Sequence, residues 1–197
     1  MRTKRGRLLL ILVVGPSGAG KDTLLNGARE ALGEHAPVRF VRRVITRPAS
    51  GRELDPGDEA HESISEQAFH ARQQAGNFAL SWRAHGLHYG VPADIGIDLA
   101  QGRVVIVNVS RAVVAEAAER FSVAVIEISA PAEMLGQRLA ARGREDAVGV
   151  ARRLSRAIEL PLPVERQRVV NDGAVAQGVC RLLKAIKAVS GRALGPS

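Results

Sequence analysis

The stretch Gly15-Pro16-Ser17-Gly18-Ala19-Gly20-Lys21 decides the fold of this chain of 197 residues. It follows an apolar run, Leu8 to Val14, that is typical of a buried strand, and it precedes a helical pattern beginning at Asp22. The order of strand, glycine-rich loop and helix is that of a P-loop, whose backbone N–H groups turn inward around phosphate oxygens. Lys21 would place a positive charge on the β- and γ-phosphates, and the helix N-terminus adds a favourable dipole. The stretch therefore predicts a nucleotide-phosphate site.

The residue that follows the P-loop lysine is unusual. This slot usually holds the Ser or Thr that binds magnesium, but here it holds Asp22, and the hydroxyl comes one residue later at Thr23. Two interpretations stay open. In the first, Asp22 and Thr23 hold a magnesium ion and its water ligands. In the second, Asp22 is a solvent-facing carboxylate that interacts favourably with the dipole at the helix N-terminus.

The amino-acid composition predicts a single domain with an aliphatic core. Apolar residues make up 46% of the chain and aromatic residues only 3%, so Leu, Val, Ile and Ala must fill the interior. The lone cysteine, Cys180, excludes an internal disulfide and fits a cytoplasmic protein. The basic N-terminus and the apolar run after it imitate a signal peptide, but the run ends in the P-loop and is too short to span a membrane. We expect no membrane partner.

The charge balance is basic, with 28 Lys and Arg residues and a formal net charge of +8. Nucleic-acid binding would explain this charge, but the sequence has no recognition motif and no aromatic residues interleaved with the basic ones. A polyanionic small substrate, or simply the arginine-rich composition that a GC-rich genome produces, explains the charge equally well. We therefore expect no nucleic-acid partner.

Strands and helices alternate along most of the chain. Helices are predicted over 22–32, 112–120, 131–142 and 174–189, and strands over 104–109, 123–128 and 169–170. This alternation predicts a parallel α/β sheet. Residues 38–92 fit it poorly, because an extended stretch, a polar loop, a short helix (65–74), a strand (78–82) and the turn Gly86–Gly90 follow one another. We expect one domain, with core 8–37 and 92–190 and an inserted substrate-binding subdomain at about 38–91.

An ordered set of motifs resembles the guanylate kinase family, and more closely its ribose 1,5-bisphosphate phosphokinase branch, from Leu8 to about Ile186. The matching pieces are Gly15 to Thr23, Ile45-Thr46-Arg47, Leu80-Ser81-Trp82, Gly86-Leu87-His88-Tyr89-Gly90, Asn108-Val109-Ser110-Arg111-Ala112, Arg138 to Glu145 and Asn171-Asp172-Gly173. The resemblance implies a P-loop NTPase three-layer sandwich with a helical lid at about 138–158. It also implies that ATP and Mg²⁺ are used to convert ribose 1,5-bisphosphate to 5-phosphoribosyl 1-diphosphate (PRPP) in phosphonate breakdown.

Two departures from guanylate kinases bear on the substrate. Those enzymes read guanine with a glutamate that aligns with Leu80, and a leucine cannot accept the paired hydrogen bonds of a guanine edge. Their Asp-x-Asp pair aligns with Ile106 and Asn108. Two alternatives remain: a diverged guanylate kinase that phosphorylates GMP, and a guanylate-kinase-like module that binds phosphoproteins without catalysis. Such modules typically lack an intact P-loop and lid, whereas this chain keeps both.

The resemblance also assigns roles to single residues. Lys21, Arg138 and Arg142 would stabilise the transferring phosphoryl group, and Asn171 would lie on the adenine side of the nucleotide. Arg47, with Thr46, resembles the clamp for the acceptor phosphate, because the planar fork of arginine can bind one phosphate twice. The remaining expected substrate contacts are His61, Tyr89, Asn108 and Arg111. Arg42, Arg43 and Arg52 are weaker candidates, since a solvated strand edge or loop explains them. The oligomeric state is left open, a homodimer included.

Overall fold

A parallel five-stranded sheet forms the centre of the molecule. The computed structural model describes residues 9–34, 36–47, 61–141, 164 and 166–191. The strands follow the order β2-β7-β1-β8-β9, and each neighbouring pair is parallel. Their bounds are β1 Leu10–Val14, β2 Val38–Phe40, β7 Val104–Asn108, β8 Val123–Ser129 and β9 Arg166–Val170. The predicted α/β class is therefore confirmed.

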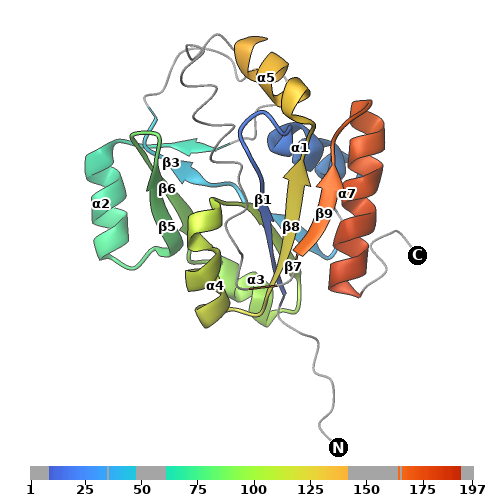
Figure 1. Ribbon diagram of the computed structural model, residues 1–197. Coiled ribbons are helices and arrows are strands. Elements are labelled where there is room, and N and C mark those ends of the chain that lie inside the picture. Colours follow the sequence, from blue (N-terminus) through green and yellow to red (C-terminus); the bar gives the residue numbers. More distant parts are fainter. Residues whose placement is uncertain (1–8, 35, 48–60, 142–163, 165, 192–197) are drawn as a thin grey trace, which may run out of the picture.

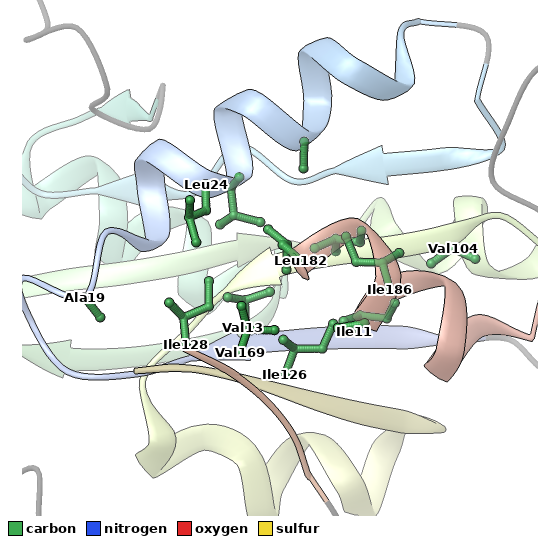
Figure 2. Packing of buried hydrophobic residues seen from close by; sticks show 14 of the residues in the cluster. Ile11, Val13, Ala19, Leu24, Val104, Ile126, Ile128, Val169, Leu182 and Ile186 are labelled. Carbon is green, nitrogen blue, oxygen red and sulfur yellow. The ribbon is translucent and has the colours of Figure 1, made fainter. Parts of the chain in front are cut away.

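Helices cover both faces of this sheet, because alternate residues of each strand point to opposite sides. Ile11 and Val13 of β1 pack against α1 (Lys21–Leu32) and α7 (Val175–Ser190), and Figure 2 shows Leu24 and Leu182 of these helices meeting there. Leu10 and Leu12 pack on the other side against α3 (Ile95–Ala100) and α4 (Val114–Arg120), which follows the 3₁₀ turn Arg111–Val113. The result is the three-layer arrangement that the resemblance implied.

A second sheet lies to one side of the first and carries helix α2 (Glu66–Gln74) (Figure 1). Its strand order is β4-β3-β6-β5, with β3 Val44–Ile45, β4 Glu62–Ser63, β5 Phe78–Ala84 and β6 Leu87–Pro92. The Ser65 hydroxyl caps α2 by accepting the Ala68 N–H. This sheet is built within the segment in which the sequence predicted an insertion.

Three details differ from the sequence predictions. Strand β2 pairs with β7, so the core sheet continues to Phe40 and the chain leaves it later than residue 38. The tight turn is only His85-Gly86, with φ of 52° and 75°, and Leu87–Gly90 belong to β6 rather than to a loop. The pattern did not predict α3 at all. Helix α5 (Ala132–Ala141) is described, whereas the rest of the predicted lid, from Arg142 to 158, lies outside the described residues.

Within the described part of the chain, no helix combines the length and apolar character that crossing a membrane requires.

Candidate active site

The P-loop backbone runs so close to the core sheet that only glycine fits at its start. Gly15 has φ of 149°, and a Cβ there would lie 2.0 Å from the carbonyl oxygen of Ile128 in β8. Gly20, with φ of 83°, is left-handed and forms the N-cap of α1. These positions curl the loop back over the end of β1, and α1 then begins with its free N–H groups facing the loop.

Lys21 and Arg138 bring positive charge to this loop from two elements. The Lys21 Nζ donates to the carbonyl oxygens of Gly15 and Pro16 at 2.9 Å each, so its ammonium lies against the loop itself. Arg138, on α5, extends its guanidinium to within 3.4 Å of the Gly18 carbonyl oxygen and 3.5 Å of the Asn171 carbonyl oxygen. The structure thus brings these two predicted residues together at the P-loop. Arg142 lies outside the described residues.

Asp22 is turned toward the carboxyl end of β7. Its Oδ1 accepts a hydrogen bond of 2.7 Å from the Asn108 side-chain amide, and Arg43 Nη2 lies 3.8 Å from the same oxygen. Asn108 is 3% exposed, and the side chains of Arg43 and Asp22 are 12% and 28% exposed. The interpretation of Asp22 as a carboxylate that simply faces solvent is therefore wrong.

Arg43 also connects the P-loop to the second sheet. Its guanidinium lies over the ring of Tyr89, 5.9 Å from the ring centroid, and Tyr89 stacks on Trp82 at 5.3 Å with nearly parallel planes. Tyr89, predicted to contact the acceptor, is thus linked through Arg43 to the first turn of α1. The sequence placed Arg43 among the weaker candidates, because two basic residues before a strand carry no sign of what they will face.

The other predicted acceptor residues lie around strand β3. Thr46 is buried and bonds twice to His88, since its N–H donates to the His88 carbonyl oxygen and its hydroxyl accepts the His88 N–H. Arg47, the next residue, is half-buried and makes no ion pair among the described residues. The His61 carbonyl oxygen accepts from Arg42. Their contacts with substrate stay predictions.

Asn171 supports the P-loop from behind. It is 5% exposed, and its side-chain amide donates to the Ala19 carbonyl oxygen at 2.8 Å while its own N–H donates to Ser129. The structure therefore shows it holding the loop in shape. Next to it, a hydrogen bond from Arg181 lowers the pKa of the Asp172 carboxyl.

Arg111 points to a different partner than the one expected from the sequence. Its guanidinium pairs with Glu127, a buried carboxylate in β8 that Arg166 also approaches, at 2.8 Å. Glu127 alternates with Ile126 and Ile128, so it lies on the sheet face opposite α1. The structure thus gives Arg111 an ion pair in the core sheet, and its contact with substrate stays a prediction.

The residues around Asp22 suit a magnesium ion that is bound mainly through phosphates and water. The described residues contain no group of three or more His, Cys, Asp or Glu side chains able to hold a metal ion. Asp22 Oδ2 has no hydrogen-bond partner in the described part of the chain, and the Thr23 hydroxyl follows in the same helical turn. Magnesium keeps several waters and uses one or two carboxylates plus substrate phosphates, so this donor set fits.

Comparisons with known proteins place the chain in a family. No protein-family model matches it. It is 51% identical over 161 residues to the ribose 1,5-bisphosphate phosphokinase PhnN of Acidiphilium cryptum, with 82% of each chain covered. It is 40% identical over 195 residues to the PhnN of Pseudofrankia inefficax, with 98% of each covered.

Two further similarities concern the length and the fold. The chain is 46% identical over 189 residues to the bifunctional ribose 1,5-bisphosphokinase-thymidine phosphorylase of Azorhizobium caulinodans, of which it spans only 27%. The crystal structure of guanylate kinase from Anaplasma phagocytophilum shares its fold, with a TM-score of 0.68, 19% identity, and coverage of 95% of this chain and 89% of that one. With the P-loop and the second sheet that faces it, these similarities show that the chain belongs to the ribose 1,5-bisphosphate phosphokinase family.

Proposed function

We propose that this protein is a kinase that transfers the γ-phosphoryl group of ATP to ribose 1,5-bisphosphate, forming PRPP and ADP in phosphonate catabolism. The observation that carries the proposal is the 40–51% identity to ribose 1,5-bisphosphate phosphokinases over most of the chain. The geometry supports the reaction class, because phosphoryl transfer depends on positioning and charge rather than on covalent chemistry.

The nucleotide half of the site is the P-loop. Backbone N–H groups of residues 15–20 would bind the phosphates, and Lys21 and Arg138 would stabilise the charge of the transferring group. Arg142 would join them. Magnesium, held through Thr23 and through water ligands of Asp22, would neutralise the β- and γ-phosphate oxygens.

The acceptor half is the second sheet and the segment leading into it. Arg47, Thr46, Tyr89 and His61 would hold the phosphate on the ribose C1 carbon, with Asn108 nearby. An oxygen of that phosphate attacks the γ-phosphorus, the bond to the β–γ bridging oxygen breaks, and ADP leaves. No general base is required, because the attacking phosphate is already an oxyanion. Closure of the helical lid would exclude water, so that ATP is not hydrolysed.

Phosphorylation of GMP is the competing activity, and Leu80 is the observation against it. Leu80 is 1% exposed and belongs to the hydrophobic cluster between the core sheet and helices α3 and α4, so an apolar side chain occupies the position aligned with the guanine-reading glutamate. A non-catalytic module is disfavoured because Lys21 and Arg138 both lie at an intact P-loop.

One assay separates these functions. Purified protein with Mg²⁺ and ATP receives either ribose 1,5-bisphosphate or GMP, and ADP release and PRPP formation are followed. We expect turnover only with ribose 1,5-bisphosphate, and Lys21→Met should lower kcat by at least about a hundredfold. Turnover with GMP alone would show a diverged guanylate kinase, and no turnover with either acceptor would favour the binding module.

A further inference from the structure

A carboxylate in the first turn after a P-loop lysine is an electrostatic problem. Asp22 directly follows Lys21, so its negative charge lies beside the place where a triphosphate binds. At the effective dielectric typical of a protein surface, two like charges about 5 Å apart repel strongly enough to change a binding constant by a factor of about a hundred or more. An uncompensated Asp22 would therefore weaken nucleotide binding by about two orders of magnitude.

The helix that carries Asp22 offers little to offset this charge. Lys21, the adjacent cation, donates to the carbonyl oxygens of Gly15 and Pro16, so its ammonium lies against the loop. Asn108 satisfies Asp22 Oδ1 with a hydrogen bond, but an amide carries no net charge. Among the residues that the structure describes, the cation that pairs with Asp22 comes from another part of the fold.

That cation is Arg43, which enters from the segment just before β3. Its Nη2 lies 3.8 Å from Asp22 Oδ1, and its side chain is only 12% exposed. The Tyr89 ring lies beneath its guanidinium, 5.9 Å from the ring centroid, and packs against it. A pair so little exposed is screened much less by salt than a surface pair, so its field reaches the neighbouring phosphate site.

We propose that Arg43 is a positioning residue that offsets the negative charge of Asp22, and thereby lets this P-loop accept a nucleoside triphosphate. The charge balance of the nucleotide site then depends on a residue of the acceptor side, because Arg43 is held by the second sheet. This role needs nucleotide binding at the P-loop only, so its test omits the acceptor and is independent of which acceptor the enzyme uses.

The test is a double-mutant cycle read out as ATP affinity. Isothermal titration of ATP in EDTA, without acceptor, compares the wild type with Arg43→Gln, Asp22→Asn and the double variant. Omitting magnesium removes any effect of Asp22 on the metal. We expect Arg43→Gln to weaken ATP binding at least tenfold, Asp22→Asn to tighten it about threefold or more, and the double variant to bind within about threefold of Asp22→Asn.

Two controls separate charge compensation from a structural role. Arg43→Lys keeps the charge and should retain affinity within about threefold. Arg42→Gln removes the same charge from an exposed neighbour and should change affinity less than twofold. The melting temperature is recorded for each variant. If Arg43→Gln does not fold, the ATP affinities of Asp22→Asn and Arg43→Lys still test whether the charge of Arg43 offsets that of Asp22.

Three results would overturn the proposal. The first is an ATP affinity that stays unchanged in Arg43→Gln. This holds also where a separate activity assay shows that the KM for the acceptor rises in this variant, because Arg43 would then act on the acceptor alone. The second is a double variant that binds no better than Arg43→Gln. The third is a loss of magnesium-free ATP affinity in Asp22→Asn.

Discussion

At Gly15 the backbone conformation and the nearby β8 backbone leave room for glycine alone. Its φ of 149° is in a region that side chains rarely adopt, and its Cβ would lie 2.0 Å from a backbone oxygen that cannot move aside. We expect Gly15→Ala to lower the free energy of unfolding by about 3 kcal/mol or more, since strain and overlap add. Gly191→Ala is the matched control: it also has positive φ, but no atom lies within 4 Å, so it should lose only about 1 kcal/mol. Urea unfolding measures both, and equal losses would contradict the expected overlap.

Leu80 makes a different point, because the substitution that looks like a change of specificity is structural. We expect Leu80→Glu to bring no GMP phosphorylation and to destabilise the protein by several kcal/mol, since it buries an unpaired carboxylate at a site that is 1% exposed. Leu80→Met, which conserves volume, should cost less than about 1.5 kcal/mol. Thermal unfolding and ADP release with GMP check the pair. A stable Leu80→Glu protein that phosphorylates GMP would show that this position alone sets the acceptor.

The structure brings predicted residues together where the motif itself fixes the geometry, and their roles in binding stay predictions. The P-loop glycines, Lys21 and Asn171 all lie together, because their order along the chain implies that strands β1 and β9 end at the same edge of a parallel sheet. Arg43 and Arg111 could not be assigned in this way. Their partners, Asp22 and Glu127, are 21 and 16 residues away in sequence and are chosen by packing, which no local pattern encodes.

At the scale of elements, periodicity was reliable for the long helices, and it missed the shortest one, α3. The helices around 22–32 and 174–189 were predicted to within about one residue at each end, because several buried turns repeat the pattern. Helix α3 has only six residues and includes Gly96, so its pattern is too short to recognise. Strand β2 pairs with β7, which lies about 66 residues away in sequence. The alternation of strands and helices cannot reveal which strand lies next to β2.

Helix α2 is tied to β4 by an ion pair that has a pH signature. Arg72 donates to Glu62 at 2.6 Å, and this hydrogen bond holds the pKa of the Glu62 carboxyl below its ordinary value. A depressed carboxyl pKa stabilises the fold above the unfolded pKa of about 4.3, and this stability is lost as the pH falls through the lower folded value. Both side chains are about 40% exposed, so the effect is small.

We therefore expect Glu62→Gln to lower the free energy of unfolding by about 0.2–1 kcal/mol at pH 7, and the difference from wild type to vanish as the pH falls below the lowered pKa of Glu62. Urea unfolding at several pH values measures it. Arg72→Gln should show the same loss, and the double variant should add little to either. A difference that persists below the lowered pKa of Glu62 would mean that Glu62 acts through packing.

At the scale of the whole molecule, the candidate site and the ion-pair network of Asp98 lie at opposite edges of the core sheet. The P-loop and Asn108 follow the carboxyl ends of β1 and β7, where parallel α/β sheets bind ligands. Asp98, in α3, lies at the other edge, where it binds Arg39 of β2 and Arg103, which precedes β7. In Figure 1, α3 lies at the bottom of the sheet and α5 at the top.

This separation predicts that stability can be lowered without loss of catalysis. Asp98 is 2% exposed, so Asp98→Asn leaves two arginines facing a neutral amide and should lower the free energy of unfolding by about 3–5 kcal/mol. Asp94, which pairs with the same Arg39, has a side chain that is 54% exposed, so Asp94→Asn should cost at most about 1 kcal/mol. Below its unfolding temperature, Asp98→Asn should keep kcat within about twofold, because no atom at the P-loop edge loses a partner. Urea unfolding and ADP release on the same preparations test both parts. A large fall in kcat without a fall in stability would mean that the two edges of the sheet are coupled, and that α3 helps to position the site.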